Sequence, residues 1–131
     1  MNTIIEIHDS TVAEIRKSDS TVIVHFLPAY LHKSEGRPGS DPGTGWVQEV
    51  LLIFAEASVS GGFPDWPCDI MDGELVVNGE RHTNSIPVPL KVTGLTELRL
   101  ICDSVHTVTV RSRGVRLELV GEPRYVEEFK P

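Results

Sequence analysis

Apolar and polar residues alternate strictly along the last third of the chain, and this period of two constrains the fold more than any other feature. The alternation runs through Leu95–Cys102, Thr107–Arg111 and Val115–Val120. Successive side chains of a β-strand point to opposite faces, so each segment predicts a strand with one face in a core. Asn78-Gly79, at the centre of Glu74–Thr83, predicts a further hairpin, because Asn-Gly accepts the positive φ angles of a type I′ turn.

Turn residues recur along the rest of the chain at a spacing of roughly 8–12 residues, which is typical of β-sandwiches and barrels. We predict a single all-β domain over residues 1–131, an antiparallel β-sandwich or barrel of about eight or nine strands. Val47–Val59 is ambiguous, because its apolar residues also align on one face of a helix, and a helix there makes the domain α+β. The predicted core consists of Val22, Val24, Phe26, Leu52, Phe54, Leu98, Leu100, Val108, Val110, Leu117 and Leu119.

The charge of the chain bears on its partners. Its 131 residues include 12 basic and 19 acidic side chains, a net charge of −7. This charge repels nucleic acid and anionic lipid and favours a basic partner. No apolar run approaches the roughly 18 residues of a membrane-spanning helix, and the first residues lack the basic and apolar regions of a signal peptide. We expect a cytoplasmic protein that binds neither nucleic acid nor membranes.

The two cysteines, Cys68 and Cys102, do not form a Cys-x-x-Cys pair, which argues against a structural zinc or thioredoxin-type site. Cys102 alternates with Leu98 and Leu100, so we expect it in the core, whereas Cys68 is expected at a loop edge. Without an export signal, a disulfide between the two is not expected.

A long polar loop, Ser34–Gly45, separates the apolar segments Thr21–Lys33 and Trp46–Ala55. Loops of this length inside a compact domain are usually functional or disordered. Aromatic residues and arginine dominate the binding hot spots of proteins, and Arg37 and Asp41 are expected to hold the loop together. The predicted binding residues are Tyr30, Arg37, Asp41, Trp46 and Trp66.

No arrangement of residues in the sequence specifies a reaction, so no catalytic residue is predicted. The leading hypothesis is a non-enzymatic binding or interaction module that binds a protein or a small ligand through the Tyr30–Trp46 loop region. A homo-oligomer is also expected, since the exposed edge of a β-domain pairs readily with a second copy.

The alternative hypothesis is a metal-dependent enzyme or a metal-binding β-barrel. Its candidate ligands are His8, Asp9, His25 and His32, because imidazole and carboxylate groups suit zinc, iron or manganese. A divalent metal is the one cofactor that the sequence suggests. Asp9 and Ser10 also have a structural use, since both side chains can hydrogen-bond to backbone amides at a turn.

The opening of the chain carries a resemblance. Ile7–Ile15, which contains a His-Asp-Ser element, is followed by a turn and the strand Thr21–Phe26. This stretch resembles a group of small bacterial β-proteins of uncharacterised function, some of which are similar to immunity proteins of bacterial toxin systems. Roughly the first fifth of the chain is covered. The resemblance implies a β-fold and a role in binding, and it implies no catalytic residue.

Overall fold

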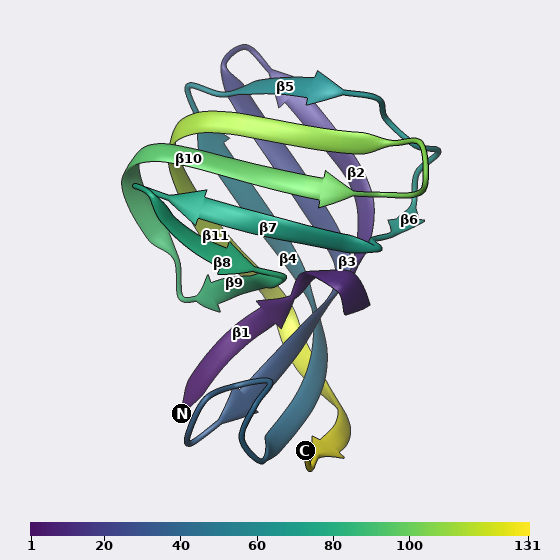
Figure 1. The fold of residues 1–131 in the computed structure, drawn as a ribbon, viewed down its shortest axis with the longest axis vertical. Helices are drawn as coiled ribbons and strands as arrows, with labels where there is room; N and C mark the ends of the chain where they lie inside the picture. The colour runs from purple at the N-terminus through teal and green to yellow at the C-terminus, as the bar shows by residue number, and fades with distance from the viewer.

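The computed structural model describes residues 1–131 as strands joined by short connections and one 3-10 turn, η1 (Figure 1). The elements are β1 (Asn2–Glu6), η1 (Ile7–Asp9), β2 (Thr11–Ser18), β3 (Thr21–Ser34), β4 (Gly43–Ala55), β5 (Ser58–Gly61), β6 (Cys68–Asp69), β7 (Asp72–Val77), β8 (Glu80–Thr83), β9 (Ser85–Val88), β10 (Lys91–Ile101) and β11 (Thr107–Phe129). The all-β prediction is confirmed. The helical alternative for Val47–Val59 is wrong, because β4 and β5 cover most of that segment.

Eleven strands form one antiparallel sheet that curls on itself. The count exceeds the predicted eight or nine partly because β5 and β6, with four and two residues, are too short for a sequence pattern to separate from their neighbours. The main order is β6-β2-β3-β4-β11-β10-β7-β8. Figure 1 shows β2, β3 and β4 crossing behind β7, β10 and the first part of β11, so the curled sheet forms two layers, which we call the body.

The core lies between these two layers and contains 24 buried apolar residues. Nine of the eleven residues predicted for the core are buried, but Leu117 is only partly buried and Leu119 is 48% exposed. The prediction for Leu119 is wrong because β11 loses its β10 partner beyond Arg116, so no second layer covers the later residues.

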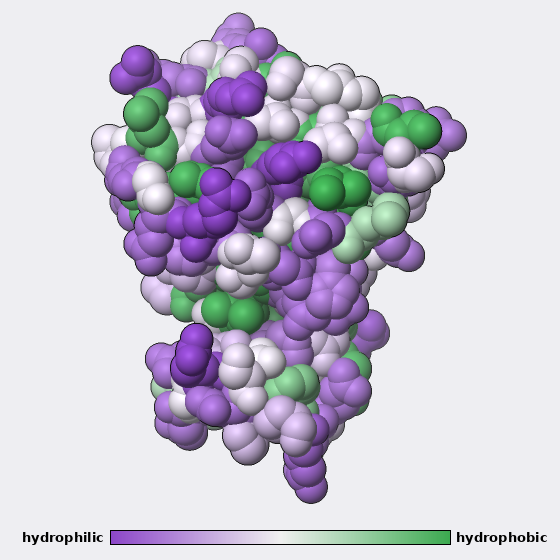
Figure 2. All heavy atoms as spheres, viewed as in Figure 1, coloured by the Kyte–Doolittle hydropathy of each residue, from purple (hydrophilic) through white to green (hydrophobic).

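Below the body, four strands continue into a narrower extension, which we call the stalk (Figure 1). It consists of β1, residues 29–34 of β3, residues 43–48 of β4 and residues 124–129 of β11. Strand pairing extends to Ser34 and Gly43, so the loop spans only residues 35–42 and is shorter than predicted. Figure 2 shows a largely hydrophilic surface over this view of the body and stalk, with apolar residues in small separate groups.

A bulge in β3 sets the side-chain directions in the stalk. Phe26 pairs with Val50 and Ala29 pairs with Gln48, so β3 holds one more residue than β4 between these pairs. Such a bulge shifts the alternation by one position. As a result Ala29 and Leu31 stay on the core side, and Tyr30 and His32 point to the other face of the stalk, where β1 ends at Glu6.

Candidate functional site

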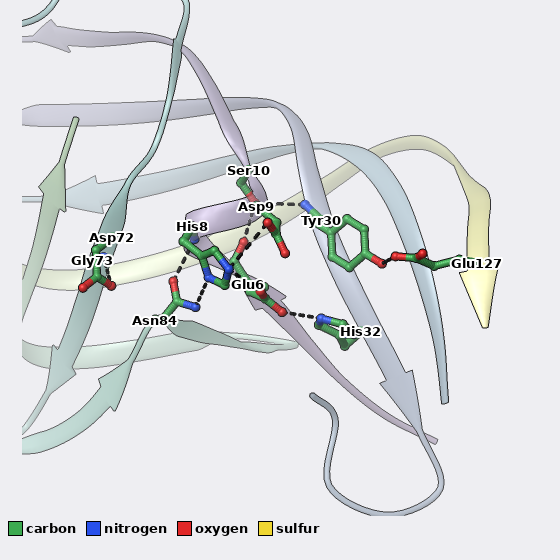
Figure 3. Close-up of polar contacts among 10 residues, drawn as sticks. All are labelled: Glu6, His8, Asp9, Ser10, Tyr30, His32, Asp72, Gly73, Asn84 and Glu127. Atoms are coloured by element: carbon green, nitrogen blue, oxygen red, sulfur yellow. Dashed lines mark hydrogen bonds and ion pairs between the residues drawn. The ribbon is translucent and has the colours of Figure 1, made fainter. Parts of the chain in front are cut away.

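Three side chains with metal-binding groups converge where β1 ends. The chain forms the single turn η1 there, closed by a hydrogen bond from Ser10 N to Ile7 O at 3.1 Å. In a 3-10 turn the side chains at positions i and i+3 eclipse, which places Glu6 beside Asp9. Ile7 is fully buried and anchors the turn, so His8 and Asp9 project outward (Figure 3).

Two of the separations among these groups match those between neighbouring ligands of one cation. His8 Nε2 lies 2.9 Å from Glu6 Oε1 and 3.5 Å from Asp9 Oδ1, and ligand atoms of all three residues lie within 4.8 Å of one another. Two ligands bound at about 2.0–2.2 Å with an angle of roughly 90–110° are themselves about 2.9–3.5 Å apart. Glu6, His8 and Asp9 therefore stand close to ligating positions; we call them the acidic turn cluster.

Asn84, in the connection between β8 and β9, fixes the orientation of His8. His8 N donates to Asn84 Oδ1 at 2.7 Å, so the amide nitrogen Nδ2 faces His8 Nδ1 and donates to it. We therefore assign the His8 proton to Nε2, which donates to Glu6. A cation that uses Nε2 must displace this proton and turn the Asn84 amide over.

His32 binds the second oxygen of the Glu6 carboxylate, the one that His8 does not contact. The imidazole is 5% exposed, donates from Nε2 to Glu6 Oε2, and packs edge-on against Tyr30 and Phe129. Its Nδ1 is buried without a hydrogen-bond partner. Because Nδ1 has no acceptor beside it, we assign the proton that Glu6 accepts to Nε2. A group that holds a ligand in this way typically orients it and raises its basicity.

Electrostatics at the cluster favour added positive charge. Burial, together with the hydrogen bond and the charge of Asp9, raises the pKa of the Glu6 carboxyl above its ordinary value, and His32 offsets part of this effect. Two adjacent carboxylates with incomplete solvation retain a proton more readily than either would alone. A divalent cation relieves the same repulsion and competes with that proton.

The acidic turn cluster opens to solvent. His8 and Asp9 line a hollow of about 270 Å³ together with Ser10, Thr11 and Asp69. Thr11 Oγ1 donates to Asp69 Oδ1 at 2.6 Å and holds this additional carboxylate at the rim. Coordination positions that face such a hollow remain open to water or to a second ligand.

Ser10 and Tyr30 hold the turn in place. Ser10 Oγ donates to Glu6 O at 2.7 Å and accepts from Tyr30 N at 2.9 Å, so it bonds a carbonyl oxygen across the turn and an amide of β3 rather than the turn amides that the sequence predicted. The Tyr30 ring lies against Gly45, and its hydroxyl donates to Glu127 Oε1 at 2.5 Å. Burial and the Glu127 carboxylate raise the pKa of the Tyr30 hydroxyl. Tyr30 thus braces β3 against β11.

The predicted set of four metal ligands is brought together only in part. His8 and Asp9 are neighbours, but His32 contacts Glu6 rather than facing the hollow, and His25 pairs with Glu49 at 2.7 Å on the other side of the β3 bulge. Sequence reasoning missed Glu6 and Asn84. The signal for Glu6 was its place two residues before His8, but Asn84 lies 76 positions from His8 and carries no local signal.

The predicted binding residues do not form one surface. Leu31, not Tyr30, stands opposite Trp46, so Tyr30 and Trp46 point to opposite faces of the stalk. Trp46 lies beneath Lys33 Nζ, 4.7 Å from the ring centroid, and packs edge-on against Tyr125 at 5.3 Å. Trp66 contacts Phe63 in the connection between β5 and β6, which belongs to the body.

Arg37 and Asp41 hold the loop between β3 and β4, as expected, but through the backbone. Arg37 N donates to Asp41 Oδ2 at 2.6 Å, and no ion pair joins the two side chains. Ser34 Oγ also donates to Pro42 O at 2.8 Å and closes the base of the loop.

No protein family, no curated protein and no solved structure matches this chain. The resemblance to small bacterial β-proteins at Ile7–Ile15 therefore stays a prediction. The structure contains no helix that is long and apolar enough to cross a membrane.

Proposed function

We propose that this chain is a cation-binding β-domain that takes up one divalent transition metal, zinc or manganese, at Glu6, His8 and Asp9. The carrying observation is the pair of distances from His8 Nε2 to Glu6 and Asp9 oxygens, 2.9 and 3.5 Å, which match those between neighbouring ligands of one ion. Two carboxylates and one imidazole suit these ions by ligand type. The hollow beside His8 and Asp9 leaves room for a further ligand on the metal.

Calorimetric titration of the metal-free protein with Zn²⁺ and Mn²⁺ tests this proposal. We expect one site per chain, with affinity at least tenfold weaker in Asp9→Asn, because the amide keeps an oxygen but loses the charge. His25→Ala serves as the matched control and should bind normally, since His25 pairs with Glu49 instead. Equal weakening in both variants, or no binding by the wild type, would contradict the proposal.

A variant that is expected to bind metal more tightly provides a second test by the same titration. Asn84→Asp places a carboxylate where both the backbone N–H and a protonated Nδ1 of His8 can donate to it, which frees Nε2 to bind metal. Carboxylate–histidine–metal arrangements of this kind change metal affinity by about 10–100-fold. We expect at least tenfold tighter binding. Asn78→Asp adds the same charge at an exposed hairpin and should leave the affinity unchanged.

A second candidate function, association with a basic partner protein, is supported by the other face of the stalk. Tyr125 is 50% exposed there and packs edge-on against Trp46. Clustered aromatic side chains of this kind anchor protein interfaces. The net charge of −7 favours a basic partner.

We expect a complex purified from the host to survive in Trp66→Ala and to be lost in Trp46→Ala. The two variants remove the same aromatic side chain, but only Trp46 lies on the stalk face beside Tyr125. Size-exclusion chromatography of each variant with the recovered partner measures the effect. Loss of the complex in Trp66→Ala alone would place the interface on the body.

A further inference from the structure

Two thiols that are distant in the sequence meet at one edge of the body. Cys68 belongs to β6, which pairs with the start of β2, and Cys102 directly follows β10 in the other layer. The Cys68 thiol donates to the Cys102 carbonyl oxygen at 3.3 Å, so the two residues are in direct contact. Figure 1 shows β6 beside the end of β10 at this edge.

The two thiols differ in access. Cys102 is 2% exposed, whereas Cys68 is only partly buried. Burial raises the pKa of both thiols, that of Cys102 to about 11, and the neighbouring carboxylates Asp69 and Asp103 act in the same direction on Cys68. Both residues are therefore thiols at neutral pH, and Cys68 is the one that a dissolved reagent reaches first.

We propose that Cys68 and Cys102 are a disulfide-forming pair that reacts with a small-molecule disulfide of the glutathione class. The Cys68 thiolate attacks one sulfur of the small disulfide, forms a mixed disulfide and releases the first small thiol. The Cys102 thiolate then attacks the Cys68 sulfur and releases the second small thiol. The protein loses two electrons and two protons, which the two released thiols carry away.

The bond would join the two layers of the body. Backbone hydrogen bonds already hold this register, from Ile70 N to Ser10 O at 3.1 Å and from Met71 N to Ile101 O at 2.9 Å. The backbone segments that carry Cys68 and Cys102 are therefore held in fixed positions relative to each other. The expectation of no disulfide rested on the compartment alone, whereas the contact between Cys68 and Cys102 arises only when the two layers pack.

Oxidation of the full chain with oxidised glutathione at mildly alkaline pH tests the proposal. Wild-type protein should lose both free thiols, with a mass decrease of two hydrogens, and a reductant should restore them. Because the bond closes a loop of about 35 residues, the melting temperature should rise by on the order of 10 °C.

Two variants separate the steps. Cys102→Ala should stop at a glutathione adduct on Cys68, and Cys68→Ser should keep its buried Cys102 thiol, with circular dichroism checking that each variant is folded. Wild-type protein that keeps both thiols, or that stops at the Cys68 adduct, would overturn the proposal.

Discussion

Gly73→Ala is expected to lower the free energy of unfolding by about 1–3 kcal/mol, the range that is typical of overpacking in a well-packed core. A Cβ at Gly73 would lie 2.7 Å from the Arg99 carbonyl oxygen and 2.9 Å from Ile7 Cγ2. The oxygen belongs to the β7–β10 ladder and cannot move alone, and Ile7 is fully buried under the η1 turn. The strain therefore spreads into the core.

The same substitution should also weaken cation binding. Gly73 O accepts from Asn84 N at 2.8 Å, and Asn84 O accepts from Ile7 N at 3.1 Å, so a displaced Gly73 shifts both the Asn84 side chain and the acidic turn cluster. Urea denaturation and metal titration measure the two effects. Gly62→Ala is the matched control, because the atom nearest to a Cβ there is Cδ2 of the His106 side chain, at 3.3 Å, and not a backbone atom. Similar destabilisation in both variants would refute this packing argument.

Glu6→Gln should change affinity and stability in opposite directions. Its cation affinity is expected to fall by about 100-fold, because Glu6 is the charged ligand that His32 orients. Its free energy of unfolding at pH 7 should rise by about 0.5–1 kcal/mol in the metal-free state. The glutamine keeps one oxygen for His32 and offers an N–H to Asp9, so it removes the repulsion between the partly buried Glu6 carboxylate and the exposed Asp9 carboxylate, which outweighs the loss of the oxygen that accepts from His8.

The direction in which the free energy of unfolding changes with pH follows from the raised pKa of Glu6. The folded state binds a proton at Glu6 more tightly than the unfolded state does, so this contribution is fully present below the unfolded pKa of about 4.3 and is lost as pH rises through the folded value. Glutamine does not titrate, and the two proteins should therefore converge in stability near pH 4. Denaturant titrations at pH 4 and pH 7 provide the comparison. A variant that is less stable than wild type at pH 7 would show that the ion contacts of Glu6 outweigh its desolvation.

Local patterns along the chain were sufficient to predict the class of fold. Leu98, Leu100, Val108 and Val110 alternate with polar neighbours, and all four are buried as predicted. The hairpin at Asn78-Gly79 also forms as predicted, with both residues at positive φ. These features depend on a few consecutive residues, since strand alternation and turn conformation are properties of the local backbone.

The candidate site was decided by tertiary structure. His8 and Asp9 were visible as candidate ligands, but His25 and His32 separate because the β3 bulge shifts which face each side chain meets. Asn84 reaches His8 only after β9 pairs with β1, and Cys68 meets Cys102 only when the two layers close. Contacts between distant segments depend on strand register, and a shift of one residue reverses every side chain, so no local pattern could specify them.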